Sequence, residues 1–145
     1  MSAFTQEFLN DFVRRYAKAW TKKESAANPL KSLITEDVRW GDPMLPQPIH
    51  GSAAVLALLE ACFTAFPDLT CDVMDPLYVC ADGKSVMFHW RLSGTMLGAL
   101  PNGAQPTGKR MSIEGADRWE FRDGRIFHYQ AYYDLGDMLR QVGLM

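Results

Sequence analysis

Apolar residues in the first twenty positions recur with the spacing of an amphipathic helix. They are Phe8, Leu9, Phe12, Val13, Tyr16 and Trp20, and basic residues fall on the opposite side of the same helix. A second apolar stretch follows Gly51 and stops before Pro67, a residue that ends helices. We therefore predict helices over residues 4–22 and 52–65.

From residue 69 the pattern changes to an alternation of polar and apolar residues, which is the period of β-strands. Asp82-Gly83 separates the first two predicted strands as in a tight hairpin, and residues 122–124 separate two more. Helices followed by hairpins predict the α+β class, with a curved antiparallel sheet of four to six strands wrapped around the N-terminal helices.

The composition narrows the kinds of partner. The chain has 145 residues, and we predict one domain over residues 1–145. A net charge of −2 offers no basic patch for nucleic acid, and no apolar run approaches the ~18 residues of a membrane span. Aromatic residues at 12% suggest surplus apolar surface, as in a pocket or an interface. We expect a hydrophobic small-molecule ligand, and neither nucleic acid nor a membrane as partner.

Cysteines and histidines give no sign of a metal or cofactor site. The three cysteines are an odd number without CxxC spacing, which is typical of free thiols in a reducing compartment. No basic region followed by an apolar run opens the sequence, so we expect a cytoplasmic protein. The three histidines lack second ligands at metal spacing, and we expect no metal.

The stretch VRWGDPMLPQPIHG, residues 38–51, places Asp42 in an apolar loop stiffened by three prolines. Apolar neighbours raise the proton affinity of a carboxylate, which improves a base that works near neutral pH. An Asp that precedes a proline is also typical of a turn, so Asp42 is either a base or a turn residue.

A second acid is predicted to point inward. In GADRWEFRDG, strand alternation places Asp117 on one face with Trp119 and Phe121, whereas the other face is charged. Asp117 is then either a structural carboxyl held by backbone amides or a functional one whose pKa is raised by its apolar site. Tyr16, on the apolar face of the first helix, is either a core residue or a hydroxyl with a partner in a site.

The order of these features resembles the nuclear transport factor 2-like superfamily across essentially the whole chain. The shared features are a first helix with an inward Tyr, the VRWGDP…HG loop, a helix and two hairpins. The phrases PTGKR and FRDGRI are similar to the SnoaL-like branch, which includes polyketide cyclases. The resemblance implies a cone-shaped sheet of the cystatin-like or nuclear transport factor 2-like kind and a homodimer. An apolar strand around residues 88–92 is consistent with an interface between subunits.

Three positions resemble the catalytic set of the ketosteroid isomerases, in the phrases VRRYAKAW, WGDP and ADRWEF. The resemblance implies that Asp42 shuttles a proton between the carbons flanking an enone. It implies that Tyr16 and a protonated Asp117 donate hydrogen bonds to the dienolate oxygen. We expect the substrate-binding residues to be Trp40, Trp119, Phe121, Tyr129 and Tyr133.

Other functions remain as alternatives. The catalytic Asp of the polyketide cyclases corresponds to Ala131 in this sequence, so a cyclase would lack its usual acid. Limonene-type epoxide hydrolases also need an acid at Ala131, and none lies beside Arg91. A non-catalytic module that binds a hydrophobic ligand or dimerises needs none of these acids.

Overall fold

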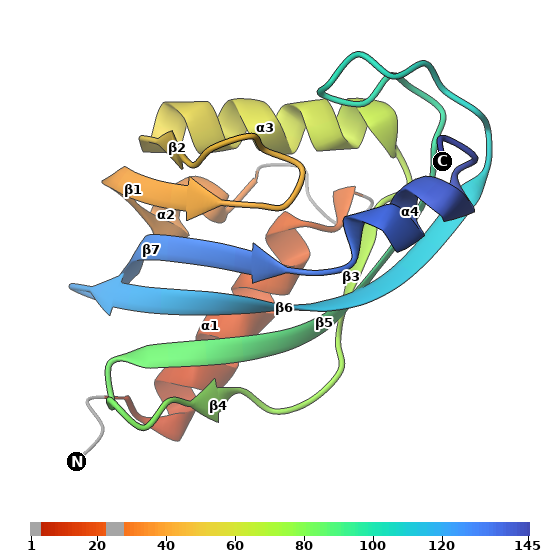
Figure 1. Cartoon of the computed structure of the whole chain (residues 1–145). Coiled ribbons are helices and arrows are strands. Elements are labelled where there is room, and N and C mark those ends of the chain that lie inside the picture. The colour runs from red at the N-terminus through yellow and green to blue at the C-terminus, as the bar shows by residue number, and fades with distance from the viewer. Residues whose placement is uncertain (1–3, 23–27) are drawn as a thin grey trace.

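The computed structural model describes residues 4–22 and 28–145 and packs their helices and strands around one hydrophobic core (Figure 1). The helices are α1 (Gln6–Ala19), α2 (Leu30–Leu33), α3 (Ser52–Ala65) and α4 (Leu135–Gln141). The strands are β1 (Ile34–Gly41), β2 (Ile49–His50), β3 (Thr70–Val73), β4 (Tyr78–Val79), β5 (Ser85–Thr95), β6 (Arg110–Arg122) and β7 (Arg125–Tyr132). Helices α1 and α3 are the two that the apolar spacing predicts.

The strands form a single curved and unclosed sheet in the order β2-β1-β7-β6-β5-β3, and β4 pairs with β5 beside β3. The α+β class is confirmed, but the strand count and the strand directions need correction. The sheet has seven strands in the described residues, and β1 runs parallel to β7. The polar–apolar period of a strand does not record which neighbour it joins or in which direction, so the parallel pair is invisible in the sequence.

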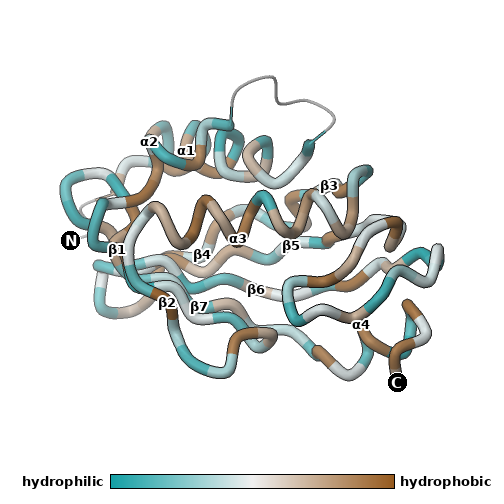
Figure 2. Tube along the Cα trace, turned by 90° about the horizontal axis from the view of Figure 1, so that it is seen from above, coloured by the Kyte–Doolittle hydropathy of each residue, from teal (hydrophilic) through white to brown (hydrophobic). Residues whose placement is uncertain are grey.

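Two helices pack on the sheet from the side of the core. In Figure 1, α1 crosses behind the long strands. The ring of Phe12 on α1 packs against Trp119 of β6, with ring centroids 5.3 Å apart. Helix α3 lies along β1 and β2. Viewed from above, α1 and α2 lie on the far side of α3 from α4 (Figure 2). Side chains of α1, α3 and the long strands contribute to one hydrophobic core.

Helix α1 begins at a capping residue. The Thr5 hydroxyl accepts a hydrogen bond from the backbone N–H of Phe8 at 3.0 Å, which satisfies one of the free N–H groups of the first turn. None of the helices in the described ranges is long and apolar enough to cross a membrane.

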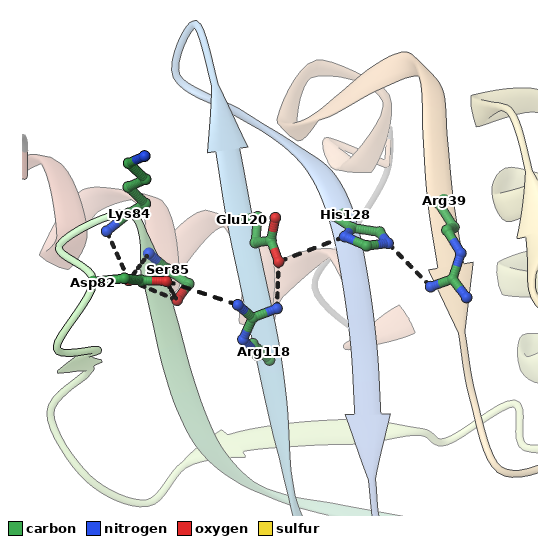
Figure 3. A network of polar contacts seen from close by, with 7 residues as sticks. All are labelled: Arg39, Asp82, Lys84, Ser85, Arg118, Glu120 and His128. Atoms are coloured by element: carbon green, nitrogen blue, oxygen red, sulfur yellow. Dashed lines mark hydrogen bonds and ion pairs between the residues drawn. The ribbon is translucent and has the colours of Figure 1, made fainter.

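A row of charged side chains crosses the outer face of the sheet (Figure 3). Arg39, His128 and Glu120 are register partners on β1, β7 and β6, and Nη1 of Arg39 lies 3.0 Å from Nε2 of His128. Arg118 pairs with Glu120 and lies 3.8 Å from Asp82. Partly exposed ion pairs of this kind contribute little to stability, and they keep this face polar.

The apolar residues of β5 do not form a subunit interface, contrary to the expectation from the sequence. Phe88 and Trp90 are buried in the core, with 0% and 5% of their surface exposed, so they cannot form the subunit interface that their apolar character suggested. The homodimer itself stays a prediction.

Candidate functional site

A cavity opens between α1, α3, α4 and the inner face of the sheet. Its lining includes Tyr16 from α1, Asp42 from the loop after β1, and Asp117 from β6. The empty volume is about 760 Å³, part of which is the open mouth. The three residues singled out as catalytic candidates in the sequence therefore line one cavity, although about a hundred positions separate the first from the last.

Asp42 presents its two carboxyl oxygens differently. Its Oδ1 accepts a hydrogen bond from the hydroxyl of Tyr133 at 2.6 Å and one from the backbone N–H of Met44 at 2.9 Å. Its Oδ2 accepts no hydrogen bond from the residues that the structure describes. Burial raises the pKa of Asp42, and the two hydrogen bonds oppose that rise. The bond to Met44, two residues on, is the contact of an Asx turn, so Asp42 is a turn residue that also lines the cavity.

Asp117 is almost completely buried, with 1% of its surface exposed. Its Oδ1 accepts hydrogen bonds from the indole Nε1 of Trp90 and from the hydroxyl of Tyr129, both at 2.8 Å. Its Oδ2 accepts a longer bond, 3.3 Å, from Nε1 of Trp119. Burial raises the pKa of Asp117 to about 7, while these donors and the hydroxyl of Tyr16 act in the opposite direction. Side-chain donors thus hold Asp117, in place of the backbone amides of the structural alternative.

Tyr16 belongs to the same buried group. Burial and the nearby Asp117 carboxylate raise the pKa of Tyr16 well above that of a free phenol, so its hydroxyl keeps its proton. The hydroxyl of Tyr129 also interacts with Tyr16 and acts against that rise. Two phenols and one carboxyl therefore lie together at the inner end of the cavity.

The expected substrate-binding residues divide into two groups. Tyr129 and Tyr133 line the cavity. Trp119 contacts the acid Asp117 without lining the cavity. Trp40 lies behind Tyr129, with the two rings stacked at 3.5 Å between centroids. Phe121 lies elsewhere, in an aromatic cluster where its ring centroid is 4.9 Å from that of Phe12.

The structure adds residues that the sequence argument did not place at the site. Trp20 and Trp90 line the cavity, and so do the thiols of Cys62 and Cys71. Burial and, to a smaller extent, the nearby Asp42 carboxylate together raise the pKa of Cys62 to about 12, so this thiol stays protonated. The alternation of apolar residues along β5 carried a signal for Trp90, because its neighbour Phe88 also points inward.

Within the part of the chain that the structure describes, the ionisable groups that line the cavity include acids but no basic side chains. Among the described residues that line it, two are carboxyls and none is Lys, Arg or His. The described part of the chain holds no cluster of three or more residues suited to a metal ion. The lining is otherwise largely apolar, so the chemistry available is that of two acids and several hydroxyls in a water-poor space.

A curved sheet that encloses a cavity with helices is the architecture of the nuclear transport factor 2-like fold. Comparison with protein families matches residues 13–129 to the SnoaL-like domain. The chain therefore belongs to the SnoaL-like domain family. No curated protein matches it significantly.

Solved structures share the fold at low sequence identity. A protein of Jannaschia sp. CCS1, provisionally described as a SnoaL-like polyketide cyclase, superposes with a TM-score of 0.83 at 19% identity, covering 100% of this chain and 97% of its own. TsrD of Streptomyces laurentii gives 0.79 at 19% identity, covering 98% and 99%. IdmH of Streptomyces antibioticus, provisionally described as a polyketide cyclase, gives 0.72 at 24% identity, covering 92% and 97%. Identities this low establish the fold alone.

Proposed function

We propose that this protein is an enzyme that moves a proton within a hydrophobic carbonyl compound, with Asp42 as the base. The observation that carries the proposal is the convergence of Asp42, Asp117 and Tyr16 on one largely apolar cavity. An acid at the edge of such a cavity and proton donors at its inner end are the parts that enolisation needs.

The proton transfer has two steps. Oδ2 of Asp42 takes a proton from the carbon next to the carbonyl, and the C–H electron pair moves toward the carbonyl oxygen to give a dienolate. Asp42 then returns the same proton to the far carbon of the neighbouring double bond, which leaves a conjugated enone. No proton is gained or lost overall, so no cofactor is required.

Tyr16 and Asp117 stabilise the oxygen of the dienolate by donating hydrogen bonds to it. Tyr16 keeps its proton, and Asp117 is protonated in a substantial fraction of molecules near neutral pH because burial raises its pKa to about 7. Each donor of this kind is typically worth about 3 kcal/mol of the barrier. The raised pKa of Asp42 makes it a stronger base than an exposed carboxylate.

Absorbance of the conjugated product tests this proposal across a panel of small and steroidal β,γ-enones. We expect Asp42→Asn to abolish turnover while leaving ligand affinity nearly intact, because the amide keeps the shape and loses the base. Asp72→Asn is the matched control, since Asp72 is exposed and lies outside the cavity. If the wild type and Asp42→Asn are equally inactive on every compound, the enzyme proposal fails and a ligand-binding module remains.

A polyketide cyclase-like reaction is the second candidate. The descriptions of the Jannaschia protein and of IdmH favour it. It would share the first step; the enolate carbon would then attack a second carbonyl carbon of the same molecule, whose C=O π pair moves onto oxygen, and the alkoxide formed there would take the proton held by Asp42. Ala131 pairs with Asp117 across β6 and β7 and lines the cavity, so a methyl group occupies the place of the cyclase acid. We favour isomerisation for this reason.

A further inference from the structure

The indole of Trp90 lies across strand β6 at a place where β6 has no side chain. Trp90 on β5 is the register partner of Gly115 on β6. A Cβ atom added to Gly115 would lie 2.6 Å from Cη2 and Cζ2 of the indole, a distance that no real contact tolerates. Gly115 therefore makes room for the ring, which extends across β6 to Asp117, two residues farther along.

Trp90 contacts the groups that hold both acids. Its Nε1 donates to Oδ1 of Asp117 at 2.8 Å. Its ring meets the ring of Tyr133 edge to face, with centroids 5.9 Å apart and planes at 62°. The hydroxyl of Tyr133 in turn donates to Oδ1 of Asp42 at 2.6 Å. Trp90 is thus the shared neighbour of the two acid centres.

The two acids are held in the same manner. In each, Oδ1 accepts two short hydrogen bonds, from Tyr129 and Trp90 at Asp117 and from Tyr133 and a backbone N–H at Asp42. Oδ2 accepts one long bond at Asp117, where the Tyr16 hydroxyl is a further partner of the carboxyl, and none at Asp42 from the described residues. In both acids the less occupied oxygen is therefore Oδ2.

We propose that Trp90 is a positioning residue that orients both acids, so that Oδ2 of each one is left for the ligand. At Asp117 it acts through its indole N–H, and at Asp42 it acts through the ring of Tyr133. This inference rests on the proposed function, because it says which oxygen of the base Asp42 and which oxygen of the donor Asp117 reacts with the ligand.

The chemistry of the indole defines what Trp90 can do at Asp117. An indole N–H donates and cannot accept, so Trp90 stabilises the carboxylate form and leaves the acid proton to Oδ2. The other titratable groups that face Asp117 are Tyr16 from α1, Tyr129 from β7 and Cys71 from β3. All three carry protons near neutral pH, because burial raises the pKa of each. Loss of the Trp90 donor therefore leaves no cation to compensate among the described residues that line the cavity.

The test measures the titration of the Asp117 carboxyl by NMR on protein labelled with ¹³C at Asp, without substrate. In Trp90→Phe we expect the midpoint of Asp117 to rise by about one pH unit or more, since a donor to the charged form is lost. Trp20→Phe is the matched control, because Trp20 lines the same cavity and its indole Nε1 has no partner in the described structure. In Trp20→Phe the midpoint of the Asp117 titration should match that of the wild type.

Two further variants keep the test decisive if Trp90→Phe does not fold. Replacement of Trp90 by β-(3-benzothienyl)alanine puts sulfur in place of the N–H and keeps the ring, so it should move the midpoint of Asp117 and leave that of Asp42 unchanged. Trp90→Ala removes the ring and should change both midpoints. An unchanged Asp117 midpoint in the folded isostere would overturn the role at Asp117, and an unchanged Asp42 midpoint in Trp90→Ala would overturn the role at Asp42. Because no substrate is present, neither result depends on whether the enone assay succeeds.

Discussion

At the scale of single residues, the site contains two acids in unlike surroundings. Asp42 is held at the cavity by one tyrosine and one backbone amide, whereas Asp117 is enclosed by aromatic donors. Pairs of carboxyls whose environments differ are suited to opposite roles, one as base and one as acid. The sequence could predict that both carboxyls face apolar surroundings, because strand alternation and the proline-rich loop are local features.

The partners of these acids could not be predicted from the sequence. Tyr133, which holds Asp42, lies 91 positions away, and Trp90, which holds Asp117, lies 27 positions away. Contacts of this kind depend on strand register, and register is set by the whole sheet. Tyr133 was expected to touch substrate, and its hydrogen bond to Asp42 is visible only in the structure.

Asp117 is expected to make the fold less stable as the pH rises. Its pKa is raised from 3.8 to about 7 by burial, so between these values the unfolded chain is ionised while the folded chain keeps the proton. Unfolding then releases a proton, and the free energy of unfolding falls through this window by at most about 1.4 kcal/mol per pH unit from this group. Above the folded pKa the effect is constant.

Urea unfolding at pH 4.5, 5.5, 6.5 and 7.5 measures this slope. Asp117→Asn should flatten it relative to the wild type, whereas the exposed control Asp72→Asn should keep it. An Asp117→Asn slope equal to that of the wild type would show that Asp117 is ionised throughout, against the assignment of a protonated donor.

At the scale of elements, the C-terminal end of α3 is held against the long loop after β5 by a close backbone approach. The backbone N–H groups of Leu97 and Gly98 both donate to the carbonyl of Ala65, at 2.9 and 3.1 Å. This contact fixes the end of α3, and Leu58 and Cys62 of that helix line the cavity. The sequence predicted α3 with its observed bounds, but nothing local indicated which loop would close over its end.

Gly98→Ala should destabilise the protein. A Cβ at Gly98 would lie 2.1 Å from the backbone oxygen of Thr64, which cannot move without bending α3. We expect a loss of about 1–3 kcal/mol, the usual cost of overpacking. Gly41→Ala is the matched control, because its Cβ would meet the flexible end of the Gln130 side chain. Thermal unfolding measures the stability of both variants. Equal melting temperatures for Gly98→Ala and Gly41→Ala would contradict the close approach at Gly98.

At the scale of the whole molecule, the curved sheet packs its inner face against the helices, and its outer face is polar. The order of helices and hairpins was enough to predict the α+β class and the SnoaL-like resemblance, which the family match confirms. The parallel pairing of β1 with β7 was not predicted, because it joins strands from the two ends of the chain.

The homodimer remains a prediction, now with a different surface. Since Phe88 and Trp90 are buried, we propose the outer face of the sheet, where Tyr132 is 51% exposed on the same face of β7 as His128. Light scattering at micromolar concentration should give twice the mass of the chain, and Tyr132→Asp should lower it. A monomeric wild type would contradict the prediction.

The central claim is that Asp42 removes a proton from a carbon next to a carbonyl, whatever the enolate does next. Deuterium incorporation into ketones in D₂O, followed by NMR, measures this step alone and applies to an isomerase and to a cyclase alike. We predict that the wild type and Asp72→Asn incorporate deuterium next to the carbonyl of a bound ketone, and that Asp42→Asn does not. Equal incorporation by Asp42→Asn, or none by the wild type on ketones shown to bind, would contradict the account.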